Sequence, residues 1–259
     1  MLSLYVVTAC GAILAGFVQG ISGFGFGLVA MSLWAWLLEP RLAATLIVFA
    51  SLLGQMLTVR TLKQGFAPTL LAPYIAGGLL GIPLGVLALP HLDMTTFRAL
   101  LGGLLALWCP AMLLAPRLPR VTAGGAAADG AAGLMGGILG GLGGFTGVIP
   151  ALWCTLRAYP KQTQRSVIQT FNLSMLLVTM LAYLTAGIVT ADMLPFFAIV
   201  APAILVPTLL GARLYARLSE ARFRQMILGL LAASGVALLA SAAGDVFAPR
   251  GPAPAQTAR

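Results

Sequence analysis

Two glycine-dense stretches hold the groups with which an apolar chain could bind an ion. The first, Gly16 to Gly27, reads GFVQGISGFGFG, and the second, Gly136 to Gly147, reads GGILGGLGGFTG. Glycine this dense in apolar sequence permits either close helix packing or a helix break that frees backbone amides. Amides at the start of a helix favour anions, because the helix dipole adds positive charge there. We therefore expect an anion site where two broken helices face each other, with tight helix packing as the alternative.

Amide side chains near these stretches add hydrogen-bond donors. Gln169 and Asn172 share one helical face within an apolar run, where amides are costly unless they bond something. Ser51 and Gln55 lie at a similar depth in the first half of the chain. Interhelical hydrogen bonding is the alternative role for all four. The predicted substrate-binding residues are Gln19, Ser22, Gly23, Phe24, Gly25, Gly143, Gly144, Phe145, Thr146, Gln169 and Asn172.

The ionisable residues offer little for catalysis. All six carboxylates fall near the ends of apolar runs, and the one histidine, His91, lies in a connection beside a proline. The sequence contains no HExxH, no GxSxG and no phosphate-binding loop, so we expect no catalytic residue, metal or cofactor. Arg165, one turn into its run, could reach toward an anion path or simply extend its charge to the membrane surface.

The composition requires a membrane to position these residues. The chain has 259 residues, of which 60% are hydrophobic and only 8% charged, against about 25% charged in soluble domains. Eight apolar runs alternate with short connections, at roughly 3–37, 42–59, 67–90, 97–115, 129–156, 164–188, 193–213 and 222–243. The first and fifth are too long for one simple crossing, so each either tilts strongly or contains a break followed by a half-helix.

The two halves of the chain resemble each other. At an offset of 120, the glycines of the first stretch fall on those of the second, and Pro40-Arg41 falls on Pro160-Lys161. At an offset of 126, Phe97-Arg98 falls on Phe223-Arg224. We predict an all-α polytopic membrane protein of about eight transmembrane helices in two related four-helix halves, each beginning with a glycine-broken helix. The expected boundaries are 1–115 and 129–244 for the halves, 116–128 for a linker and 245–259 for a disordered tail.

Charge and cysteine content complete the sequence-based expectations. Most of the net charge of +9 flanks apolar runs, as in multi-pass proteins of the cell membrane, and no basic patch suggests nucleic acid. With eight crossings and the N-terminus outside, nine basic residues, Arg41 and Arg98 among them, fall on the cytoplasmic side and six on the other. Parallel and inverted repeats both remain open, as does a homo-oligomer. The three cysteines are scattered and indicate no disulfide framework.

The chain resembles the sulfite exporter TauE/SafE-like family of membrane permeases over roughly residues 5 to 243. The first half supplies GFVQGISGFGFGLVAM and EPRLAATLIVFASLLGQ, and the second supplies GGILGGLGGFTGVIPAL and YPKQTQRSVIQTFNLSM. The second half is the more specific match, through GGLGGFTG, the YPK turn and QTFNLS. The resemblance implies an eight-span duplicated permease that moves sulfite, a sulfonate or a related organosulfur or carboxylate anion.

Two alternatives to an anion permease remain. One is a membrane-embedded scaffold or subunit without transport activity, and the less favoured one is a membrane enzyme. The polar residues at depth and the two glycine stretches favour a permease, whose partners would be a small anion and the lipid bilayer. The site assignment predicts that Asn172→Ala or Gly144→Leu abolishes flux in a protein that still folds.

Overall fold

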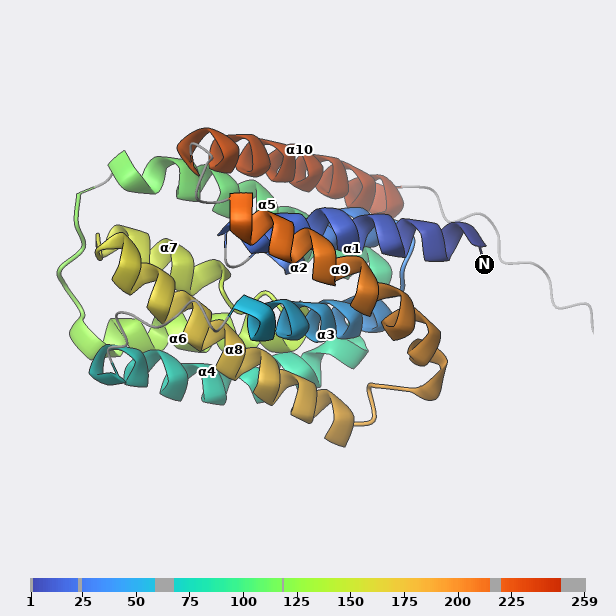
Figure 1. The fold of residues 1–259 in the computed structure, drawn as a ribbon, viewed down its shortest axis with the longest axis horizontal. Helices are drawn as coiled ribbons and strands as arrows, with labels where there is room; N and C mark the ends of the chain where they lie inside the picture. Colours follow the sequence, from blue (N-terminus) through green and yellow to red (C-terminus); the bar gives the residue numbers. More distant parts are fainter. Residues whose placement is uncertain (1, 23–24, 59–67, 118, 215–219, 248–259) are drawn as a thin grey trace, which may run out of the picture.

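The computed structural model shows a bundle of α-helices that lie along one long axis (Figure 1). It describes residues 2–22, 25–58, 68–117, 119–214 and 220–247. The first half contains α1 (Leu2–Ser22), α2 (Phe26–Trp34), α3 (Pro40–Thr58), α4 (Pro68–Ala88) and α5 (Met94–Leu114). The second contains α6 (Gly125–Gly143), α7 (Val148–Leu156), α8 (Lys161–Thr185), α9 (Leu194–Leu214) and α10 (Glu220–Phe247).

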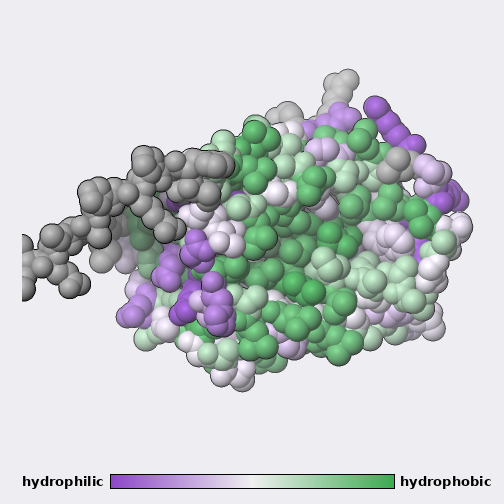
Figure 2. Space-filling model, turned by 180° about the vertical axis from the view of Figure 1, so that it is seen from behind, coloured by the Kyte–Doolittle hydropathy of each residue, from purple (hydrophilic) through white to green (hydrophobic). Residues whose placement is uncertain are grey.

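The long helices confirm a polytopic membrane protein. Within the described residues, seven helices are long and apolar enough to cross a bilayer: α1, α3, α4, α5, α8, α9 and α10. The 19-residue α6 has the length of a span but is rich in glycine, and it brings the long helices to the expected eight. Figure 2 shows apolar side chains over the middle of one face and hydrophilic residues toward its two ends. Such a belt matches the hydrocarbon core of a membrane.

Both glycine stretches break their helices, as the sequence predicted. In the first, α1 ends at Ser22 and α2 begins at Phe26 after Gly25, whose φ is +99°. In the second, α6 ends at Gly143, and Gly144 has a φ of +75° before α7 begins at Val148. These two angles lie in the left-handed region that favours glycine. Each break is followed by a helix of nine residues, too short to cross the membrane alone.

The two short helices fold back along the helices that precede them. Trp34, at the end of α2, packs against Gly11 in the middle of α1, where an added Cβ would meet its indole ring. Arg157, just after α7, hydrogen-bonds the backbone oxygen of Gly125 at the start of α6 over 2.7 Å. The pairs α1–α2 and α6–α7 are therefore re-entrant hairpins, whose tips lie inside the bundle.

The repeats are inverted, which settles a point that the sequence left open. Ser22 at the end of α1 and Lys161 line the same pocket, and Lys161 follows α7, whose end contacts the start of α6. Figure 1 shows that α1 runs inward from the end of the molecule where the N-terminus lies, whereas α6 runs inward from the opposite end, so these helices run in opposite directions. The packing repeats accordingly, because α1 packs against α9 as α6 packs against α4.

Close packing of these helix pairs accounts for many of the other glycines. A Cβ added at Gly20 would lie 3.0 Å from Cα of Gly211 on α9. One added at Gly81 on α4 would lie 3.1 Å from the carbonyl carbon of Gly137 on α6. The packing interpretation thus holds for these positions, while Gly25 and Gly144 form breaks.

Two predicted boundaries differ from the structure. The expected linker 116–128 extends into α6, because that helix already begins at Gly125. The expected tail begins at 245, but α10 continues to Phe247, and residues 248–259 lie outside the described part of the chain.

Candidate functional site

The tips of the two hairpins meet at a small polar cavity, which we call the central cavity. A Cβ added at Gly27 would lie 3.2 Å from Cδ1 of Phe145 and 3.4 Å from the backbone oxygen of Gly144, so this glycine lets the tips approach. The cavity has a volume of about 20 Å³. It is lined by Gln19, Gly25, Phe26, Gly27, Leu28, Ser51, Gln55, Gly144, Phe145, Thr146, Gly147, Val148, Asn172 and Leu176.

Amide side chains supply the polar atoms of the central cavity. The Nε2 group of Gln19 donates to the backbone oxygen of Ser51 over 3.0 Å, and its buried Oε1 has no hydrogen-bond partner among the described residues. The hydroxyl of Thr146 donates to Oδ1 of Asn172 over 2.9 Å. Because that oxygen is the acceptor, the Nδ2 group is the part of Asn172 that can donate to an anion.

Two helix N-termini point their dipoles at the central cavity. Phe26 and Val148, the first residues of α2 and α7, both line it. The first amides of α2 have no partner within that helix. At α7 the amide of Val148 donates to the backbone oxygen of Phe145 over 3.2 Å and Pro150 has no N–H, so this end acts mainly through its dipole, which is equivalent to about half a positive charge. No acidic residue is among the described residues that line the cavity. Its walls therefore offer neutral donors and positive dipoles, which suit a small anion.

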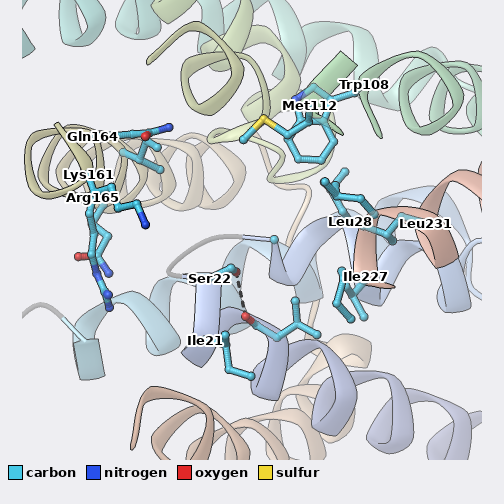
Figure 3. A pocket seen from close by; sticks show the side chains of 16 residues that line it. Ile21, Ser22, Leu28, Trp108, Met112, Lys161, Gln164, Arg165, Ile227 and Leu231 are labelled. Atoms are coloured by element: carbon cyan, nitrogen blue, oxygen red, sulfur yellow. Dashed lines mark hydrogen bonds between the residues drawn. The ribbon is translucent and has the colours of Figure 1, made fainter. Parts of the chain in front are cut away.

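A larger pocket, which we call the vestibule, shares lining residues with the central cavity, and Figure 3 shows the side chains around it. It has a volume of about 150 Å³. The first turns of α8 contribute Lys161, Gln164 and Arg165 to its wall. Gly25 and Leu28 line both spaces, so the first hairpin forms part of the wall between them. The vestibule therefore reaches from the end of the bundle where α8 begins, with Lys161 and Arg165, which we call the basic end, to the wall of the central cavity.

Gln169 is the most unusual side chain of the vestibule. It is 1% exposed, and neither Oε1 nor Nε2 has a hydrogen-bond partner among the described residues. A buried amide without partners costs about 1–3 kcal/mol relative to one that is hydrogen-bonded. Such a side chain is explained by a ligand or water that satisfies it in another state of the protein.

The structure brings most of the predicted site residues together but divides them between the two spaces. The central cavity receives Gln19, Gly25, Gly144, Phe145, Thr146 and Asn172, and the vestibule receives Ser22, Gly25 and Gln169. Gly143 instead packs beneath the ring of Phe145, where an added Cβ would lie 2.6 Å from Cε2. Gly23 and Phe24 lie outside the described residues. Substrate binding by these residues stays a prediction.

Sequence reasoning missed a buried polar cluster that anchors the second hairpin. Asp129, in the second turn of α6, forms a salt bridge of 3.0 Å with Arg157. The same carboxylate oxygen accepts from Nε1 of Trp153 over 2.7 Å and from the hydroxyl of Tyr74 over 3.3 Å. The cluster joins α4, α6 and the end of α7 at the basic end of the molecule. Asp129 stands at the edge of an apolar run, where an acidic residue can be either exposed or buried. The sequence alone therefore did not indicate that Asp129 is buried.

Inverted repeats with re-entrant hairpins that meet at a polar cavity are typical of membrane transporters. The chain belongs to the sulfite exporter TauE/SafE family, whose model matches residues 8–238. No curated protein and no solved structure matches the chain. The family confirms the resemblance noted in the sequence and agrees with a transporter rather than an enzyme.

Proposed function

We propose that this transporter moves a small anion, namely sulfite, a sulfonate or a related organosulfur or carboxylate anion, across the cytoplasmic membrane. The observation that carries the proposal is the convergence of two helix N-termini and the amide of Asn172 on a cavity without acidic residues. Those donors replace the hydration shell of an anion without the cost of burying a fixed cation.

The central cavity is too small for such an anion in this conformation. Its volume of about 20 Å³ holds about one water molecule, so a sulfite-sized anion needs the hairpins to separate. The vestibule is much larger and meets the central cavity at Gly25 and Leu28. We infer that the anion passes between the vestibule and the central cavity when Gly25 and Leu28 move aside.

Charge at the two ends of the bundle supports one orientation in the membrane. Because the hairpins are re-entrant, Arg41 and Arg98 lie at the opposite end from Arg157 and Lys161, which corrects the distribution expected from eight simple crossings. Eight basic residues of the described helices and connections lie at the vestibule end: Arg117, Arg120, Arg157, Lys161, Arg165, Arg213, Arg222 and Arg224. At the opposite end, the only Lys or Arg residues in the described part of the chain are Arg41 and Arg98. From the positive-inside rule we infer that the vestibule faces the cytoplasm and that the N-terminus lies outside.

Cysteine labelling tests this orientation. The exposed residues Thr190 and Arg120 lie at opposite ends, and each can be changed to cysteine in a protein that carries Cys10→Ala. A membrane-impermeant maleimide added to intact cells is expected to label the Thr190→Cys variant, and to label the Arg120→Cys variant only after lysis. The reverse pattern would show that the vestibule faces outward.

Flux in proteoliposomes tests the proposed function. Purified protein is expected to carry labelled sulfite or methanesulfonate down its gradient faster than protein-free vesicles do. Gln169→Leu should lower that flux about 10- to 100-fold if the amide bonds the moving anion, since such a bond is worth about 1.5–3 kcal/mol. Mass spectrometry of the internal solution should recover the anion unaltered.

The same assay separates the alternatives. An enzyme would release a chemically changed product, and a scaffold would give no flux above the protein-free vesicles. If sulfite, methanesulfonate and acetate all remain at the protein-free rate, the proposed function is wrong.

A further inference from the structure

The vestibule has two chemically different walls. One is formed by Lys161, Gln164 and Arg165 at the start of α8, with Gln169 one turn deeper. The opposite wall is apolar and comes from α5 and α10, and Figure 3 shows Trp108, Met112, Ile227 and Leu231 across the space from the α8 side chains. An inorganic oxyanion would use the first wall only.

The apolar wall is fixed and large enough to matter. Nε1 of Trp108 donates to the backbone oxygen of Val148 over 2.7 Å, so its indole is held in place by the start of α7. The volume of about 150 Å³ equals that of an apolar cavity that admits benzene. Water next to such a wall is easily displaced by hydrocarbon, which gains free energy in proportion to the apolar area covered.

We propose that the vestibule selects organic anions, with the oxyanion head at the α8 wall and the hydrocarbon part against Trp108, Met112 and Leu231. This proposal rests on the proposed function and names the substrate class within it. The two cations and the positive start of α8 hold the head, whether it is a sulfonate or a carboxylate. The apolar wall then distinguishes anions by the length of the attached chain.

A homologous series of competitors tests this selection. Unlabelled straight-chain sulfonates from methanesulfonate to pentanesulfonate are added to proteoliposomes that take up labelled sulfite, beside the matching carboxylates. The concentration for half-inhibition is expected to fall up to about fourfold with each added methylene in both series. If it stays constant along both series while sulfite is still transported, the selection proposal is wrong and the proposed function stands. If no anion is transported at all, both proposals are wrong.

Neighbouring leucines on α10 provide a matched pair of variants. Leu231 is 5% exposed and lines the vestibule, whereas Leu230 is 64% exposed on the outer face of the same helix. Leu231→Ala is expected to reduce the preference for pentanesulfonate over methanesulfonate roughly tenfold, and Leu230→Ala should leave it unchanged. Should Leu231→Ala fail to fold, Ile227→Ala on the same wall serves instead. An unchanged preference in a folded wall variant would overturn the proposal.

Discussion

Replacing Asn172 by alanine is expected to reduce anion flux at least tenfold, toward the rate of protein-free vesicles. Asn172 is 3% exposed and presents its Nδ2 group at the central cavity, where the two hairpin tips meet. A hydrogen bond to a charged group contributes about 1.5–3 kcal/mol, so its loss corresponds to about a 10- to 100-fold fall in rate. The substitution also leaves the hydroxyl of Thr146 without its acceptor. Initial uptake of labelled sulfite or methanesulfonate measures the effect.

A threonine on the same helix provides the control for Asn172→Ala. Thr179 lies two turns further along α8, is fully buried, and its hydroxyl has no hydrogen-bond partner among the described residues. Thr179→Val removes that hydroxyl at nearly constant volume, so flux should stay at the wild-type rate. Wild-type flux in a folded Asn172→Ala protein would remove Asn172 from the site.

The other substitution suggested by the sequence, Gly144→Leu, is a poor probe of the site. Gly144 has a φ of +75°, and a Cβ there would lie 2.8 Å from Cγ2 of Ile47 and 3.2 Å from Cγ2 of Val48. A leucine would therefore strain the backbone and displace α3, and the expectation that this variant folds normally is corrected. Loss of flux in Gly144→Leu would not distinguish a lost binding group from a misfolded hairpin.

The helix breaks could be predicted from the sequence because glycine has a direct physical consequence. Dense glycine in runs too long for one crossing left few options besides a break, and Gly25 and Gly144 adopt the left-handed backbone that such a break uses. The amides of Gln19 and Asn172 could also be found, since an amide in an apolar run needs a partner. Both residues lie away from the ends of their apolar runs in the sequence, and both are buried in the bundle.

The direction of the short helices and the vestibule could not be predicted in the same way. Hydropathy reports that a segment is apolar, but a helix that turns back after nine residues has the same composition as one that continues. Trp108 and Leu231 face the vestibule, whereas Leu107 and Leu230 face outward, and all four side chains suit either place. Because hydropathy does not show that α2 and α7 turn back, the sequence also assigned the basic residues between the helices to the two ends of the bundle incorrectly.

The largest effect on stability is expected from Asp129→Ala. The short α7 does not cross the membrane, so its position depends on contacts at its two ends rather than on the bilayer. The salt bridge between Asp129 and Arg157 fixes one of those ends. The helix dipoles also favour both charges, because a helix start favours an acid and a helix end favours a base. Asp129 is near the start of α6, and Arg157 follows the end of α7. The side chains of the pair are 7% and 10% exposed, so water screens them little.

Removing one member of a buried pair costs about 3–5 kcal/mol, because the remaining charge stays buried without its counterion. Asp129→Ala also leaves Nε1 of Trp153 without its acceptor. Arg157 keeps its bonds to the backbone oxygens of Thr122 and Gly125, so we expect the lower end of that range, about 3 kcal/mol. Denaturant unfolding of the purified protein in detergent measures the loss, and Asp192→Ala, an exposed acid at the opposite end, should change stability by less than about 0.5 kcal/mol.

A double-mutant cycle isolates the ion pair from the packing around it. In Asp129→Ala/Arg157→Met no buried charge is left without a partner, so the double variant should be less destabilised than the sum of the two single variants by at least about 1 kcal/mol. Recovery of this size would show that the charges act on each other and hold α7 against α6. Strictly additive losses would instead mean that Asp129 acts through its bonds to Trp153 and Tyr74, and that the salt bridge does not anchor the second hairpin.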